Sequence, residues 1–150
     1  MSPARWVASF GGSGLLPGAP GTAGSAAALL PGVALLWLHP LALLGGVFGV
    51  VALGLWAIEA AGADDDPGWV VIDEVAGQWI ALLALAHPSL LGTLAAFVAF
   101  RLFDVVKVGP VGWAERLPGA VGVIADDVVA GLLAAVLVGG LRWAVPGVFN

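Results

Sequence analysis

Two acidic residues interrupt an otherwise apolar stretch near the middle of the sequence. Asp73 and Glu74 stand within residues 70–78, where Gln78 is the only other polar side chain. In a helix, which turns by about 100° per residue, Glu74 and Gln78 share one face and Asp73 lies on the neighbouring face. One acid would be enough to complement the positive end of a helix. The pair therefore indicates a site for acid–base or metal chemistry.

A second group of charges lies in residues 100–107. If this segment is helical, Arg101, Asp104 and Lys107 fall within a sector of about 120°. The spacing fits a ladder of i, i+3 ion pairs. It also fits an acid that holds a metal beside two cations that bind phosphate oxygens.

Two adjacent acids, Asp126 and Asp127, stand in front of the apolar run 128–145. One aspartate at this place is a natural helix N-cap, and a second is more than a cap requires. By contrast, the three consecutive aspartates at 64–66 are interpreted as a solvated turn.

A loop of small residues, 11–25, leads into an apolar run near the N-terminus. Such loops expose backbone N–H groups that can bind phosphate next to a helix N-terminus. Thr22 and Ser25 either contribute to a phosphate site of this kind or cap the helix.

The composition is that of a membrane protein and excludes several classes of function. Of the 150 residues, 61% are hydrophobic and 10% are charged, against roughly 45–50% and roughly 25% in soluble domains. The absence of cysteine excludes disulfides, thiolate metal sites and cysteine-dependent phosphatases. Five scattered cations form no basic face, so no nucleic-acid partner is expected. We expect a single membrane-embedded domain over residues 1–150.

The apolar runs predict an all-α fold, a compact bundle of about five helices with a polar site at one end. Residues 41–58 contain no polar side chain, and as a helix they would extend about 27 Å, close to the ~30 Å of a bilayer core. The other runs are 23–38, 70–86, 90–103 and 128–145.

The turns between these runs predict which segments share a face of the membrane. His39–Pro40 and His87–Pro88 read as tight turns, because proline disfavours helix at the residue before it. If each run crosses, all the acidic motifs lie on one face and both histidines on the other, which argues against histidine chemistry. The motif face also carries three cations against Arg142 opposite, so we expect it to be cytoplasmic.

Four stretches, in this order and spacing, resemble one family. They are residues 14–25, 66–77, 100–107 and 122–131, and they are similar to phosphatidylglycerophosphatase A. The resemblance implies a Mg²⁺-dependent lipid phosphatase of the bacterial inner membrane. Such an enzyme converts phosphatidylglycerophosphate, bound among membrane lipids, to phosphatidylglycerol and phosphate.

Together with the residue chemistry, the resemblance predicts a role for each polar motif. Carboxylates without cysteine favour a hard, oxygen-bound cation such as Mg²⁺. Attack by water, with a carboxylate that is not on the metal, such as Glu74, as base, and an aspartyl-phosphate intermediate both stay open. The predicted catalytic residues are Asp73, Glu74, Asp104 and Asp127; the metal ligands are Asp73, Asp104, Asp126 and Asp127; the substrate-binding residues are Thr22, Ser25, Arg101 and Lys107.

Two other classes of function use intramembrane acids. A CDP-alcohol phosphotransferase also binds Mg²⁺, but its D-G-x2-A-R…D-x3-D signature is absent from the sequence. An ion or proton conductor could use the same carboxylates, but it would not need the cations or the glycine-rich loop beside them.

Overall fold

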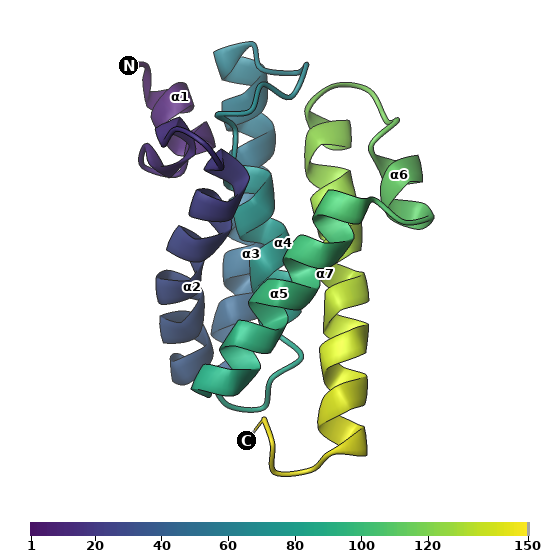
Figure 1. Ribbon diagram of the computed structural model, residues 1–150. Helices are drawn as coiled ribbons and strands as arrows, with labels where there is room; N and C mark the ends of the chain where they lie inside the picture. The colour runs from purple at the N-terminus through teal and green to yellow at the C-terminus, as the bar shows by residue number, and fades with distance from the viewer. Residues whose placement is uncertain (150) are drawn as a thin grey trace.

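The computed structural model describes residues 1–149, which form helices joined by short connections (Figure 1). No strand occurs in this part of the chain, so the predicted all-α fold is confirmed. The helices are α1 (Pro3–Ala8), α2 (Pro20–Leu38), α3 (Pro40–Ala61), α4 (Ile72–Leu82), α5 (Leu90–Val106), α6 (Pro110–Ala114) and α7 (Gly119–Ala144), with a 3₁₀ turn, η1 (Ser13–Leu15), between α1 and α2.

Three of these helices, α2, α3 and α7, are long and apolar enough to cross a membrane. Large hydrophobic side chains cover their outer surfaces, for example Leu30, Phe48 and Val136. Apolar side chains facing outward suit a hydrocarbon environment, in which helices satisfy their own backbone hydrogen bonds. The short helices α1 and α6 were not expected from the hydropathy pattern.

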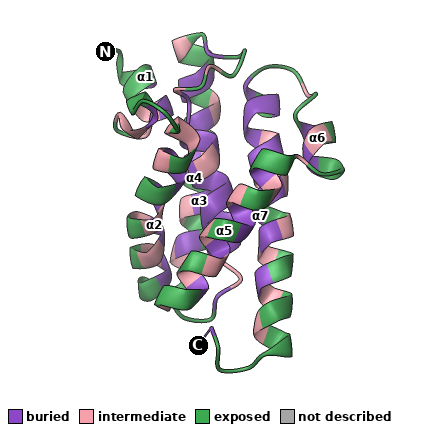
Figure 2. Ribbon diagram, viewed as in Figure 1, coloured by how far each residue is buried: buried purple, intermediate pink, exposed green. Residues whose placement is uncertain are grey.

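Helix α4 occupies the centre of the bundle and contacts α2, α3, α5 and α7. Every residue of α4 except Glu74 is buried, as its colour in Figure 2 shows. The core around it includes the fully buried side chains of Phe100, Leu43 and Ile58. The polar residues of α4 are therefore held inside the protein and do not face lipid.

The backbones of α4 and α7 approach each other at two glycines. A Cβ atom on Gly131 would lie 2.9 Å from the Cα of Gly77 and would run into its carbonyl oxygen. A Cβ atom on Gly77 would lie 2.5 Å from the carbonyl oxygen of Asp127. Small residues allow close helix packing within membranes. Here the contact lies one helical turn from both Asp73 and Asp127.

The predicted turns place the polar motifs at one end of the bundle. His39 is the C-cap of α2 and the N-cap of α3, and its Nδ1 accepts a hydrogen bond from the Leu41 N–H at 3.1 Å. His87–Pro88 lies in the connection between α4 and α5. Figure 1 shows both turns at the end opposite α1, α6 and the connection between α3 and α4.

Two helices begin earlier than expected, which overturns the capping interpretations. α7 begins at Gly119, so Asp126 and Asp127 lie well inside it and neither is its N-cap. α2 begins at Pro20, after Ala19, and no side chain caps it, so Thr22 and Ser25 do not cap it either. Proline is favoured in the first turn of a helix because its missing N–H has no intrahelical partner there.

Candidate active site

A polar pocket of about 290 Å³ lies at the end of the bundle that carries the motifs. It is formed by the first residues of α2, the connection before α4, the start of α4, the end of α5 and the first half of α7. Its polar lining combines six carboxylates with two cations: Asp66, Asp73, Glu74, Asp104, Asp126 and Asp127, with Arg101 and Lys107. Motifs far apart in sequence thus meet in one place.

Three of the acids form a tight cluster. One carboxylate oxygen from each of Asp73, Glu74 and Asp127 lies within 4.8 Å of the other two. Asp73 and Asp127 are only 5% and 3% exposed. Asp73 Oδ1 and Glu74 Oε2 are buried without a hydrogen-bond partner within the described residues. Like charges this close and this buried repel one another strongly, so the cluster needs a cation or protons.

The cluster fits a hard divalent cation. All its donor atoms are carboxylate oxygens, which Mg²⁺ and Ca²⁺ prefer, and among residues 1–149 Asp73 Oδ1 and Glu74 Oε2 have no hydrogen-bond partner. Asp73 and Glu74 lie in the first turn of α4, where the helix dipole also favours negative charge. The positive end of the α4 dipole and a bound cation would therefore both stabilise the negative charge of Asp73 and Glu74.

Arg101 pairs with Asp104 at the end of α5. The Arg101 side chain is only 20% exposed, and it also packs against the first turn of α2. A Cβ atom on Gly21 would lie 3.3 Å from both Arg101 Nη atoms and would collide with Glu74 Oε1. Glycine at this position thus leaves room for both the Arg101 guanidinium and the Glu74 carboxylate next to the first turn of α2.

Lys107 is the second cation of the pocket and follows the last residue of α5. Its left-handed backbone, with φ of 52°, turns the chain away from α5. Lys107 Nζ lies 2.5 Å from Asp126 Oδ2 and 3.5 Å from Glu115 Oε1. Burial lowers the pKa of Lys107, but the hydrogen bond and the charge of Asp126 outweigh it and raise that pKa above its ordinary value. Lys107 is therefore a fixed positive charge.

The arrangement divides the predicted acids into two groups. Asp73, Glu74 and Asp127 form the cluster, whereas Asp104 and Asp126 pair with Arg101 and Lys107. Of the two interpretations of residues 100–107, the ion pair applies to Arg101 with Asp104. The metal-site interpretation applies to the neighbouring acid cluster in the same pocket.

Comparison with known proteins assigns the chain to a family. The sequence profile of phosphatidylglycerophosphatase A matches residues 6–142. The chain belongs to the phosphatidylglycerophosphatase A family. The matched region contains every residue that lines the polar pocket.

Three relatives, which carry two different names, match most of the chain. Phosphatidylglycerophosphatase A of Escherichia coli is 37% identical over 83% of this chain and 74% of its own length. The Haemophilus influenzae protein of the same name is 35% identical over 95% of this chain and 91% of its own length. A Bacteroides thetaiotaomicron protein, provisionally named a phosphatidylinositol-3-phosphatase, is 41% identical over 89% of this chain and 90% of its own length. No solved structure matches significantly.

Two of the predicted substrate-binding residues lie outside the lining of the pocket. Ser25 is fully buried, and its hydroxyl donates to the Gly21 carbonyl oxygen at 2.8 Å. Thr22 is exposed on the first turn of α2. Their family motif reaches the pocket through Pro20 and Gly21 instead.

The sequence motifs, taken one at a time, do not identify Asp66 as a residue of the pocket. Asp66 was interpreted as part of a solvated turn, but it lines the pocket. All three aspartates of this turn are exposed, but Asp64 and Asp65 do not line the pocket. The available signal was that the second family-like stretch begins at Asp66.

Proposed function

We propose that the protein is a membrane lipid phosphatase that hydrolyses phosphatidylglycerophosphate to phosphatidylglycerol and phosphate. The observation that carries the proposal is the meeting of the acid cluster with Arg101 and Lys107 in one pocket of a phosphatidylglycerophosphatase A family member. Acids that suit a divalent cation, next to cations that suit phosphate oxygens, are what phosphomonoester hydrolysis needs.

We also propose Mg²⁺ as the cofactor, held by Asp73, Glu74 and Asp127. The support is their all-oxygen donor set and its unpartnered buried atoms. When bound, the ion would neutralise the three acids and polarise the phosphoryl group. Glu74 is the only one of the three that is not fully buried, so water entering the pocket reaches it first. Glu74 offers one oxygen to the ion, and we assign the proton of the attacking water to its other oxygen.

The two cations would bind the phosphate that is removed. Arg101 can offer two parallel N–H donors to phosphate oxygens, and Lys107 a compact charge. Asp104 and Asp126 hold these side chains in place through their ion pairs. This assigns Asp104 and Asp126 an orienting role beside the metal cluster, which differs from the ligand role predicted from the sequence.

The hydropathy and the charges support a bacterial inner-membrane location with the pocket facing the cytoplasm. Arg5, Lys107 and Arg116 lie toward the pocket end of the bundle, and Arg142 lies near the other end of α7. Positive residues favour the cytoplasmic side. Single cysteines introduced at positions 64 and 115 should both react with a membrane-impermeant reagent applied to the cytoplasmic face. Neither should react when the reagent is applied to the opposite face. Labelling of the two from opposite faces would contradict the shared site.

The decisive experiment is phosphate release by the purified protein in detergent micelles. Phosphatidylglycerophosphate and phosphatidylinositol 3-phosphate would be compared, each with Mg²⁺ and with a chelator. We expect Mg²⁺-dependent release from phosphatidylglycerophosphate, abolished by Asp73→Asn and retained in Glu59→Gln, whose side chain is exposed at the end of α3. Release from phosphatidylinositol 3-phosphate alone would replace the proposed substrate with the one in the Bacteroides protein's name.

A further inference from the structure

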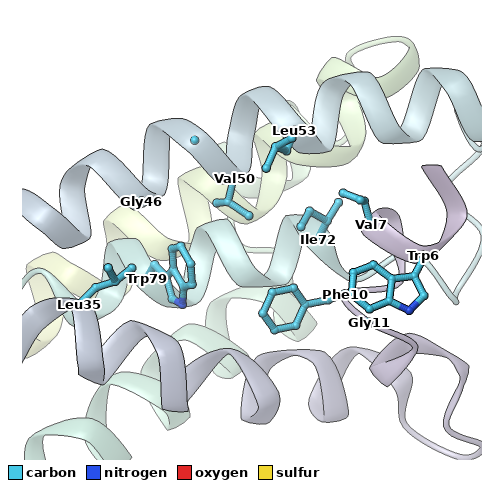
Figure 3. A pocket seen from close by; sticks show the side chains of 11 residues that line it. Trp6, Val7, Phe10, Gly11, Leu35, Gly46, Val50, Leu53, Ile72 and Trp79 are labelled. Carbon is cyan, nitrogen blue, oxygen red and sulfur yellow. The ribbon is translucent and has the colours of Figure 1, made fainter. Parts of the chain in front are cut away.

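A second pocket shares no lining residue with the polar pocket (Figure 3). Its volume is about 530 Å³, within the roughly 300–1,000 Å³ typical of ligand sites. It forms an apolar groove between α1, α2, α3 and α4, and its walls include Trp6, Phe10, Leu35, Leu53, Ile72 and Trp79. The indole N–H of Trp79 is already donated to the Ala28 carbonyl oxygen at 2.8 Å. The tryptophan therefore presents only its apolar ring to the groove.

The groove is separate from the active site. Ile72 and Trp79 line it and are seven residues apart, so they share one face of α4. Asp73 and Glu74 are turned away from Ile72 by about 100° and about 200° around the same helix. A ligand in the groove therefore meets a different face of α4 from a phosphate at the acids.

Glycines on α3 open the wall of the groove. Gly46 and Gly49 both line it. A Cβ atom on Gly46 would lie 2.9 Å from Leu35 Cδ1 and 3.1 Å from Trp79, so this position is already tight. A Cβ atom on Gly49 would meet nothing within 4 Å. The space next to Gly49 is therefore room for a ligand and gives a clean position for blocking it.

The residues around the groove indicate which kind of ligand it binds. Two of its walls, α2 and α3, are long and apolar enough to cross the membrane, so acyl chains reach it. Next to Trp6, Arg5 is exposed, and its guanidinium lies over the Trp69 ring at 4.7 Å from the ring centroid. Arg5 forms no ion pair within the described residues, and no acid occurs before Glu59 in the chain. A cation and an aromatic residue at the membrane interface suit a lipid phosphate.

We propose that this groove binds one acyl chain of an anionic bilayer phospholipid whose phosphate pairs with Arg5. The bound lipid is distinct from the lipid that is hydrolysed. The proposal does not depend on the proposed activity.

The test uses phosphatidylglycerol with a photoreactive acyl chain, in phosphatidylcholine nanodiscs that contain the purified protein. Cross-links should map to groove residues such as Phe10 and Leu53. Gly49→Leu should lower this cross-linking about tenfold, because its side chain displaces about two methylene groups of the ligand. Gly45→Leu is the matched control, since Gly45 is on the same helix, lies outside the groove and also has open space around it. Equal cross-linking in the two variants would overturn the proposal.

Two further arms test the headgroup and the identity of the lipid. Arg5→Gln should remove the preference for photoreactive phosphatidylglycerol over photoreactive phosphatidylcholine, and an unchanged preference would refute the pairing with Arg5. Gly49→Leu should leave the KM for a long-chain lipid phosphate substrate unchanged. A raised KM for long-chain substrate, with unchanged KM for a short-chain one, would show that the groove holds the substrate's own chain.

Discussion

Replacing Gly131 by alanine should disable the active site without touching any of its side chains. The added Cβ atom would lie 2.9 Å from Gly77 Cα, whereas carbon atoms in contact prefer about 3.5–4.0 Å. The backbones of α4 and α7 must then separate locally by about 1 Å. Gly77 lies four residues after Asp73, and Gly131 lies four residues after Asp127. Each acid is therefore one helical turn from the contact, and moving the two backbones apart also moves both acids.

The expected cost follows from the tolerance of catalytic geometry. A misplacement of about 1 Å can lower a rate by about 10²-fold. Overpacking should also lower the free energy of unfolding by about 1–3 kcal/mol. We expect Gly131→Ala to reduce kcat for phosphate release by about two orders of magnitude, and to weaken Mg²⁺ binding measured by calorimetry. Thermal unfolding monitored by circular dichroism would show that the variant remains folded.

The matched control is Gly139→Ala, two turns further along the same helix. A Cβ atom there meets nothing within 4 Å. This variant should keep full activity and gain up to about 1 kcal/mol from helix propensity. If folded Gly131→Ala keeps the wild-type kcat and Mg²⁺ affinity, the close approach of the two helices does not set the geometry of the acid cluster.

Five other substitutions, in three sets, test which residues take part in catalysis. Asp73→Asn and Asp127→Asn should each lower kcat by about 10³-fold or more, and the double variant should be little worse than the poorer single one, because the acids act as a unit; fully additive losses would place them in separate sites. Lys107→Met should raise the KM for the lipid phosphate about tenfold, and by the same factor at pH 7 and pH 9, since its raised pKa keeps it charged throughout this range; a pH-dependent factor would show that it titrates there. His39→Ala and His87→Ala should retain kcat/KM within a few-fold, and a large loss in folded protein would require a histidine in the mechanism.

The sequence predicts the longer helices and the turns between them, though not α1 and α6, because each depends on local chemistry. Long apolar runs define the spanning helices, and the two His–Pro dipeptides mark the turns between them. The start of α7 was misjudged because the two acids stand directly before the apolar run 128–145 and look like a helix boundary. Burial against α4 and α5 allows these acids to lie inside the helix instead.

The composition of the site is visible in the sequence, but its internal arrangement is not. Family-like motifs identified all the acids of the cluster and both cations. Which acid joins the cluster and which pairs with a cation depends on how α4, α5 and α7 cross. That crossing is governed by Gly77 and Gly131, and no local pattern pairs two glycines 54 positions apart. The role of Asp66 was missed for the same reason, since only the packed structure turns it toward the pocket.

The central position of α4 also determines when during synthesis the enzyme can become active. With 11 residues, α4 extends only about 17 Å, too short to cross a bilayer alone, and it carries two carboxylates. Its favourable environment is supplied by neighbours, two of which, α5 and α7, leave the ribosome after it. Asp127, the third acid of the cluster, arrives only with α7. A nascent chain that has inserted only α2 and α3 therefore has no partly active site. Catalysis begins only when α7 has entered the membrane and packed against α4.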